Sequence, residues 1–411
     1  MSELSRRIAN LSPQQRVLLE QRLTMHRAET GAENRATVRP RDRAQPAPLS
    51  FAQQRLWFLA QLDTDSPQFT VAAGLRLRGI LDVDALRRAL ETIVERHEVL
   101  RTTYASIDGT PIQVIGENRR VEVPLVDLSG EAESQRDAEI ARLVEQTRQH
   151  RFDLSRDLPL QAALLRLGSD EHILLMAWHH IASDNWSAGV FDRELSALYD
   201  AFACGEPLPL PELPIQYGDF AVWQRERLQG PLLETHLNYW RTQLGDSPPS
   251  LDLPTDRPRP RVQTFQGAEE VVQIPRMLSE ALLRLSRQED ATLFMTLVAA
   301  FKTLLYRYSG QTDVLVGTPI SGRQAVETEN LLGLFLNTLV LRSDFNGDPS
   351  FRELLRRVRT VALGAFSHQD LPFERLVEEL RIERDLSRAP LFQVMFNLRN
   401  RARPPLELAG L

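Results

Sequence analysis

The sequence predicts a mixed α/β (α+β) protein that folds as two lobes. A chain of 411 residues is long for a single hydrophobic core, so two lobes of about 200 residues are the natural expectation. Segments with strand and helix patterns follow one another in both halves, which is typical of layered folds. A proline-rich stretch at residues 245–266 separates the halves, and we expect the linker between the lobes there.

Residues 1–47 are predicted to form a helix followed by a linker. Ser12 is a good capping residue and Pro13 suits the first position of a helix, so we expect a helix over residues 12–26. Residues 27–47 are polar and contain prolines, which is typical of a linker. A helix tethered in this way at the start of a chain is most simply a docking or capping element.

The N-terminal lobe is predicted to span residues 48–244. Asp108-Gly109 is a hairpin signal, because both residue types accept the backbone angles of a tight two-residue turn. Apolar residues recur at helical spacing between residues 83 and 97. We expect helices at residues 50–59, 83–97, 135–150, 187–202, 217–228 and 232–244, and strands at residues 71–78 and 173–178.

The C-terminal lobe is predicted to span residues 267–411 and to mix strands and helices in the same way. Glycines surround the polar segment Ser321-Gly322-Arg323, which predicts a long irregular loop between residues 317 and 333. Loops of this kind often carry function. We expect helices at residues 279–287, 291–308 and 350–366, and strands at residues 268–274, 313–319 and 392–398.

The candidate active site is the end of the strand predicted at residues 173–178. This apolar run leads into His179 and His180, and Asp184 follows four positions later. Adjacent residues of a strand point to opposite faces, so one histidine can reach a ligand while the protein holds the other. A bare histidine pair is more often packed than catalytic, and the rest of the chain has to decide between these readings.

Composition excludes several classes of function. A net charge of −6 argues against nucleic-acid binding. Cys204 is the single cysteine, which excludes an internal disulfide framework and a cysteine-based metal site, and we expect no metal. There is neither a long apolar run nor a signal peptide, so we expect a cytoplasmic protein.

The chain resembles the condensation domains of nonribosomal peptide synthetases, which share the two-lobed fold of chloramphenicol acetyltransferase. The resemblance implies two lobes in a V arrangement with a tunnel between them. It extends over about 350 residues and far beyond one motif, because all matching blocks occur in family order. These blocks are residues 50–59, 96–104, 178–187, 217–223, 332–342, 368–374 and 384–391.

The resemblance implies an acyltransferase of antibiotic and other secondary metabolism that forms an amide bond. A donor carrier protein presents an acyl or peptidyl thioester, and an acceptor carrier protein presents an aminoacyl group. Each substrate is tethered to the 4'-phosphopantetheine arm of its carrier. The domain is expected to need no cofactor of its own, and its partners are the upstream and downstream carriers with adjacent synthetase domains.

The resemblance also assigns roles to individual residues. His180 corresponds to the central catalytic histidine and His179 to its structural neighbour. Asp184 corresponds to the partner of an arginine, for which we favour Arg101 over Arg96. The irregular loop resembles the one that floors the tunnel, and the segment after Phe392 resembles the strand that latches the second lobe to the first. Possible tunnel residues are Gly317, Ser321 and Asn337.

The chemistry of this reaction agrees with a single well-placed histidine. An α-amine has a pKa of about 8, and a thioester is already an activated acyl donor. The remaining tasks are to orient the amine and to accept one proton, for which imidazole is suited near neutral pH. General base catalysis contributes about 10²–10⁴-fold, and holding two tethered substrates together contributes at least as much.

Two positions after Asp184 deserve separate expectations. Asn185 stands where the family motif has glycine, which could serve a positive φ angle or a close backbone approach to substrate. Asparagine tolerates left-handed conformations, so either this is an ordinary variant or the domain is a modified subtype that, for example, dehydrates a tethered seryl group. Ser187 is predicted to cap a helix, because no Gly-x-Ser-x-Gly elbow surrounds it.

Two further readings stay open. An epimerisation domain shares the His-His-x-x-x-Asp pattern, but residues 50–59 and 384–391 favour the condensation type. A catalytically silent platform that recruits another enzyme is expected to lack the second histidine, and His180 is present. The sequence contains no adenylation or carrier motif, so we expect carriers in trans or a larger enzyme. The chain ends at Leu411, earlier than the family implies, and we expect a truncated C-terminal lobe.

Overall fold

The computed structural model describes most of the chain from residue 37 onwards. The described residues are 37–63, 66–117, 120–245, 248–263, 267–381, 387–399 and 406–411. The helix predicted at residues 12–26 lies outside them. Among the residues described, no helix is both long and apolar enough to cross a membrane.

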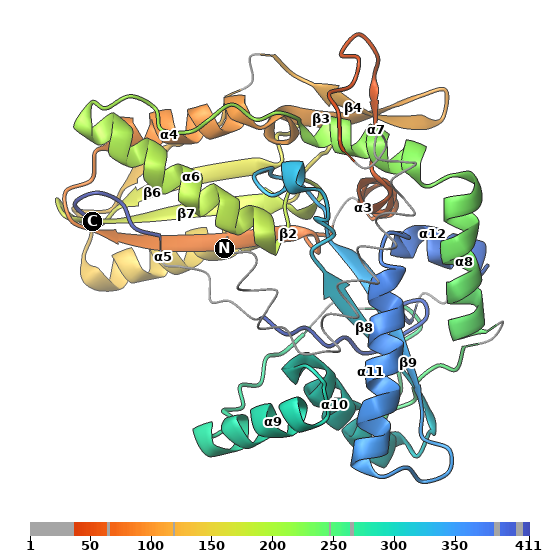
Figure 1. The fold of residues 1–411 in the computed structure, drawn as a ribbon. Helices are drawn as coiled ribbons and strands as arrows, with labels where there is room; N and C mark the ends of the chain where they lie inside the picture. Colours follow the sequence, from red (N-terminus) through yellow and green to blue (C-terminus); the bar gives the residue numbers. More distant parts are fainter. Residues whose placement is uncertain are drawn as a thin grey trace, which may run out of the picture.

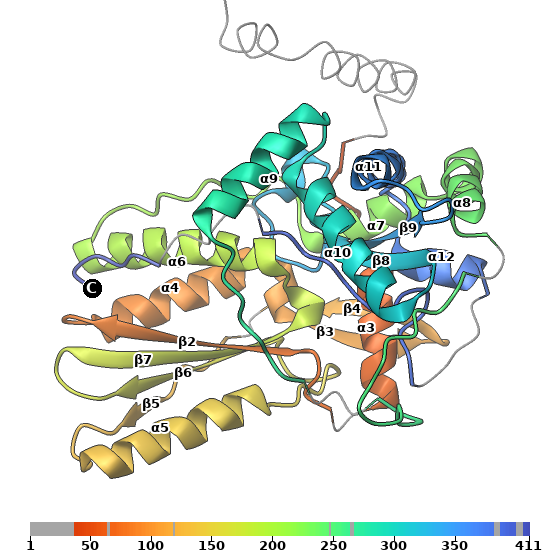
Figure 2. The ribbon, with the colours of Figure 1, turned by 90° about the horizontal axis from the view of Figure 1, so that it is seen from below.

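The first lobe is built on a four-stranded sheet with the order β2-β7-β6-β5. Only β5 and β6 are parallel, and the other neighbours are antiparallel. Helices α4 and α6 cover one face and α5 covers the other (Figures 1 and 2). The strands and helices concerned are β2 (Thr70–Arg78), α4 (Val83–Arg96), β5 (Leu125–Asp127), α5 (Glu133–Arg148), β6 (Leu160–Arg166), β7 (Glu171–His179) and α6 (Asn185–Cys204).

Strand β7 shows why this sheet is buried on both faces. Leu174, Met176 and Trp178 belong to the core under α4 and α6, whereas Ile173 and Leu175 belong to the smaller core under α5. Successive side chains of a strand alternate between faces, so an unbroken apolar run serves two cores at once. The sequence pattern of this strand is therefore fully explained by its central place in the sheet.

A small sheet and two helices complete the first lobe. The sheet has the order β1-β4-β3, and β3 and β4 form the predicted hairpin, in which Asp108 and Gly109 adopt φ angles of 50° and 79°. The short turn η2 leads from α4 into this hairpin. These elements are β1 (Ala47–Pro48), α3 (Phe51–Leu62), η2 (Glu98–Arg101), β3 (Thr102–Ile107), β4 (Thr110–Ile115) and α7 (Tyr217–Arg227).

The second lobe has its own core around the antiparallel pair β8 and β9. Helix α8 falls inside the predicted N-terminal lobe, but its buried residues Leu237, Trp240 and Leu244 belong to this second core. The elements of the second lobe are α8 (Gly230–Leu244), α9 (Arg276–Gln288), α10 (Leu293–Ser309), β8 (Asp313–Ile320), η4 (Val326–Thr328), β9 (Asn337–Asp344), α11 (Phe351–Ser367) and α12 (Phe373–Glu379).

Two predicted strands are wrong. Residues 268–274 form no strand, and Val271 and Val272 are exposed, because an apolar pattern yields a strand only where another strand pairs with it. The segment after Phe392 is not a regular strand either. Its backbone hydrogen bonds join Val394 and Phe396 to Gly317 of β8, within the second lobe.

The predicted latch role of the segment after Phe392 stays a prediction, and the contacts with the first lobe lie near the end of that segment. Residues 406–411 lie on the first lobe, where Leu408 joins the core and the Ala409 N–H donates to Asp200 Oδ1 at 2.7 Å. The loop between β8 and β9 also crosses to the first lobe. Leu331, Leu332, Leu334 and Phe335 of this loop are buried in the first core.

Candidate active site

The two histidines lie at the end of strand β7 in the sheet of the first lobe. Strand β7 pairs with β2 on one side and β6 on the other, and its last residue, His179, lies opposite Thr70. The following residues His180–Ala182 form a short 3-10 turn, η3. His180 is thus delivered at the tip of a rigid strand and not within it.

His179 is a buried structural residue. Its Nδ1 accepts a hydrogen bond of 3.1 Å from the Ile181 N–H, and the rings of Phe69 and Phe152 lie beside it. Burial, reinforced by the neighbouring His180, lowers the pKa of His179 to about 3. The ring is therefore neutral near pH 7, and its Nδ1 lone pair is used by the turn that it supports.

His180 has the free functional group of the pair. Its backbone N–H donates to Phe69 O at 2.8 Å, which fixes the main chain, while the side chain is only half-buried. Its Nδ1 is buried and has no hydrogen-bond partner among the described residues. No described residue therefore holds the His180 ring through this nitrogen, in contrast to Nδ1 of His179.

Asp184 caps helix α6 and binds the second lobe at the same time. Its Oδ1 accepts hydrogen bonds of 2.8 Å from both the backbone and the hydroxyl of Ser187. Its Oδ2 accepts one of 3.0 Å from the Phe335 N–H, and Arg323 lies 3.4 Å from Oδ1. The side chains of Asp184 and Arg323 are 2% and 1% exposed, so this is a fully buried ion pair between the lobes.

The predicted arginine partner of Asp184 is wrong. Arg101 donates to Gly116 O at 2.7 Å and lies 3.9 Å from Glu98, while Arg96 pairs with Glu194 at 3.0 Å. Arg96 is the last residue of α4 and pairs across to α6, whereas Arg101 is the last residue of η2, so both side chains are engaged away from Asp184. Arg323 lies 139 positions from Asp184, and no local pattern in the sequence pairs the two residues.

Ser187 joins the histidine turn to the second lobe. Asp184 is the cap of α6, and Ser187 lies in its first turn, so the predicted capping role of Ser187 is wrong. Its single hydroxyl proton is shared between Asp184 Oδ1 and Gly333 O, which lies at 2.7 Å, and its oxygen accepts from the Gly333 N–H at 3.1 Å and from Arg323 at 2.8 Å. The loop of residues 321–336, which we call the site loop, is thereby fixed against the motif.

Asn185 is the first residue of α6 and is exposed. Its helical backbone does not need the positive φ that glycine favours, so that reason for a glycine does not apply in this chain. The other reason, a close approach of substrate to the backbone, stays a prediction.

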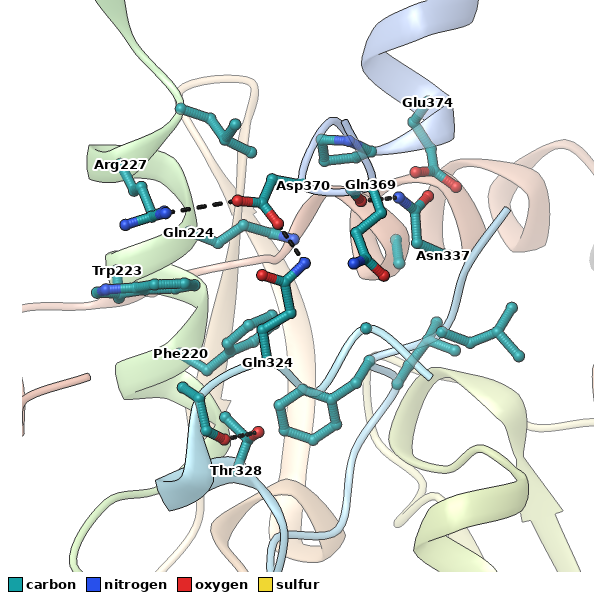
Figure 3. A pocket seen from close by; sticks show the side chains of 18 residues that line it. Phe220, Trp223, Gln224, Arg227, Gln324, Thr328, Asn337, Gln369, Asp370 and Glu374 are labelled. Carbon is teal, nitrogen blue, oxygen red and sulfur yellow. Dashed lines mark hydrogen bonds and ion pairs between the residues drawn. The ribbon is translucent and has the colours of Figure 1, made fainter. Parts of the chain in front are cut away.

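The three possible tunnel residues have different surroundings. Gly317 lies within β8 against the ring of Phe392, and Ser321 is exposed directly after β8. Asn337 lines a cavity between α7, the site loop and the turn before α12 (Figure 3). Its amide donates at 2.9 Å to both Gln369 O and Leu371 O, so it holds that turn in place.

The cavity in Figure 3 is not the histidine site. Gly317, Ser321 and His180 are absent from its described lining, which includes Trp223, Gln324 and Asp370. Asp370 contacts Arg227 of α7 at 3.4 Å and also binds Gln324 of the site loop. This cavity therefore marks a second junction between the lobes.

Comparison with known proteins shows which family has this architecture. The family model for the condensation domain matches residues 43–404. The chain belongs to the condensation domain family. Its sheet-and-helix architecture confirms the predicted fold class, while the V arrangement and the tunnel stay predictions.

Curated relatives of this condensation domain are parts of peptide synthetases. A linear gramicidin synthase subunit from Brevibacillus parabrevis is 53% identical over 358 residues, which are 87% of this chain and 7% of that protein. Phosphinothricin tripeptide synthetase PhsC of Streptomyces viridochromogenes is 44% identical over 396 residues, 96% of this chain and 36% of that protein. The chain thus spans a small part of the length of these relatives.

Solved structures with this fold include condensation domains and an X-domain. The X-domain from teicoplanin biosynthesis aligns with a TM-score of 0.79 and 32% identity, over 87% of this chain and 79% of that one. The first condensation domain of the calcium-dependent antibiotic synthetase aligns with a TM-score of 0.71 and 22% identity, over 89% and 83%. The second likeness shows the fold alone.

Proposed function

We propose that this condensation domain joins a carrier-bound acyl or peptidyl thioester to a carrier-bound aminoacyl group. The amine nitrogen attacks the thioester carbonyl, the C–N bond forms, and the C–S bond breaks. The products are an amide on the acceptor carrier and a free thiol on the donor's 4'-phosphopantetheine arm. One proton leaves the attacking nitrogen and one reaches the departing sulfur.

The observation that carries this proposal is the contrast between the two histidines. His179 is sealed and neutral, and its Nδ1 is occupied by the Ile181 N–H. His180 stands at the tip of the same strand, half-buried and with an unpaired Nδ1 among the described residues. An imidazole in this place is suited to orient the amine and to take up its proton.

The arrangement around the histidines supports a positioning function for the remaining motif residues. Asp184 and Ser187 bind the site loop through Phe335, Gly333 and Arg323. We assign them no contact with substrate. Their part is to keep two lobes in register around His180, because misplacement of a catalytic group by about 1 Å can cost 10²-fold in rate.

The experiment that tests the proposal compares one loaded carrier with two. Carriers of the flanking modules are loaded separately, and the species tethered to each are identified by mass spectrometry. The proposal expects a mass gain on the acceptor only when both carriers are present. Inversion of an α-carbon with a single carrier would instead show epimerisation, and no product from any functional carrier pair would overturn the proposal.

A recruitment platform is the second candidate. One solved relative is the teicoplanin X-domain in complex with OxyB, at a TM-score of 0.80 and 31% identity. A platform predicts that substitution of His180 leaves its function intact. A catalytic domain predicts loss of product, so the same variant separates the two candidates.

Asn185 offers a test of the modified-subtype reading. Asn185→Gly restores the family residue at an exposed helix start, where its effect on stability is small. We expect the variant to give the same product mass as the wild type. A product that differs by one water between the two proteins would support dehydration of the tethered residue.

A further inference from the structure

A buried hydrogen-bonded chain links the first lobe to the site loop through His97. His97 follows the end of α4 and is 1% exposed. Its Nε2 lies 2.7 Å from Glu194 Oε2 on α6, and its Nδ1 accepts from the Leu332 N–H at 3.4 Å. Leu332 directly precedes Gly333, the residue that Ser187 holds.

The partners of His97 fix its protonation state. The Leu332 N–H can only donate a hydrogen bond, and a carboxylate can only accept one. Burial opposes ionisation of Glu194, but the bond to His97 and the charge of Arg96 hold the pKa of Glu194 below its ordinary value. The imidazole must therefore donate from Nε2 and accept at Nδ1, which is the neutral Nε2–H tautomer.

Protonation of His97 would break this arrangement. The imidazolium carries N–H groups on both nitrogens, so Nδ1–H would face the Leu332 N–H. Burial is the main cause that lowers the pKa of His97, and the charges of Arg96 and Arg323 act in the same direction. The hydrogen bond to Glu194 and its charge oppose them without reversing the shift.

We propose that His97 is a positioning residue whose neutral ring anchors the site loop, and that acid releases this anchor. The loop is then held at successive points, by His97 at Leu332, by Ser187 at Gly333 and by Asp184 at Phe335. Because folding depresses the pKa of His97, the anchor is intact above the unfolded value of about 6.5 and is lost as pH falls through the folded value.

Two substitutions separate the contacts of the ring. The amide of His97→Asn lies near the place of Nδ1 and can still accept from Leu332, whereas the amide of His97→Gln reaches the place of Nε2 and can still donate to Glu194. Both remove the titrating group. Hydrogen exchange of the full chain is measured between pH 5 and 8 in peptides that cover residues 326–336. The rates are corrected for intrinsic exchange, and residues 173–178 serve as the reference.

We expect His97→Gln to reduce protection of the loop by about 2- to 12-fold at every pH, as for the loss of one net hydrogen bond. In the wild type, protection of the loop should fall to the level of His97→Gln only in acid. In His97→Asn, protection should not fall in acid. Wild-type protection in His97→Gln, or the same acid loss in His97→Asn, would overturn the proposal. If neither variant folds, a wild-type loop whose protection does not fall in acid relative to residues 173–178 would refute it.

The outcome of this experiment does not depend on the proposed function. Hydrogen exchange is measured without carriers, so the anchor can fail while amide formation is confirmed, and the reverse. A role of His97 that is merely structural would lower protection of the reference strand and the loop together, and the asparagine variant would not rescue the loop.

Discussion

At the residue scale, the buried pair of Asp184 and Arg323 connects the motif to the second lobe. Removing one partner of a buried ion pair leaves an uncompensated charge and costs about 3–5 kcal/mol. Asp184→Asn keeps a good helix cap, because asparagine and aspartate cap equally well. We expect this variant to have a lower free energy of unfolding in urea. The activity of each folded molecule should change little.

A double-mutant cycle tests the corrected partner directly. Asp184→Asn combined with Arg323→Ala should show a coupling energy of about 0.5–3 kcal/mol, as expected for residues in contact. The matched control is Arg101→Ala, whose guanidinium bonds Gly116 instead. If the effects of the Asp184 and Arg323 substitutions were additive while those of Asp184 and Arg101 were coupled, Arg101 would be the partner, as the sequence suggested.

His179 gives a prediction for the pH dependence of stability. Its folded pKa of about 3 lies below the unfolded value, so the unfolded chain binds the extra proton and stability falls as pH drops below about 6.5. Each such proton contributes a slope of about 1.4 kcal/mol per pH unit. His179→Asn, which keeps an acceptor for Ile181, should flatten the curve of unfolding free energy between pH 6 and 4 by up to this amount. An unchanged slope would show that His179 is not the titrating group.

At the element scale, Gly322 is the position of the site loop with the least space for a side chain. A Cβ at this position would lie 1.9 Å from Phe335 O, and its φ of 65° is unfavourable for other residues. Gly322→Ala should displace the loop, which we expect to destabilise the protein by more than about 1 kcal/mol in thermal unfolding. Gly130→Ala is the control, because no atom lies within 4 Å of its Cβ position. Equal effects of the two variants would contradict the close packing of the loop.

The elements that the sequence predicts well are those whose signals are local. The periodicity of α4 and the hairpin at Asp108-Gly109 depend on neighbours within a few residues. The histidine turn is predictable for the same reason. Residues 268–274 failed because a strand needs a partner from elsewhere, and α8 was placed with the wrong core because amphipathicity does not say which core a helix joins.

The site residues that could not be predicted from the sequence are those whose contacts join distant segments of the chain. Arg323 was visible only as part of a polar loop, and its pairing with Asp184 depends on how the second lobe returns to the first. His97 was visible as part of the block at residues 96–104. Its contact with Leu332 spans 235 positions, and no spacing rule predicts it.

At the scale of the whole molecule, the lobes are joined on both sides of the site loop. Tyr217 of α7 donates to Leu334 O at 2.5 Å and is itself bonded to Ser50 at 2.8 Å, and burial raises the pKa of its hydroxyl, which keeps it a donor. Arg227 and Asp370 form the second junction. The loop thus belongs to the second lobe by sequence and to the first core by packing.

The central claim is that His180 acts on substrates that two carriers bring to one site. The most direct measurement is the single-turnover rate of acyl transfer between loaded donor and acceptor carriers, for the wild type and for His180→Ala of equal thermal stability. General base and orienting functions together predict a loss of at least about 10²-fold in this rate. A variant that transfers the acyl group at the wild-type rate would contradict the account.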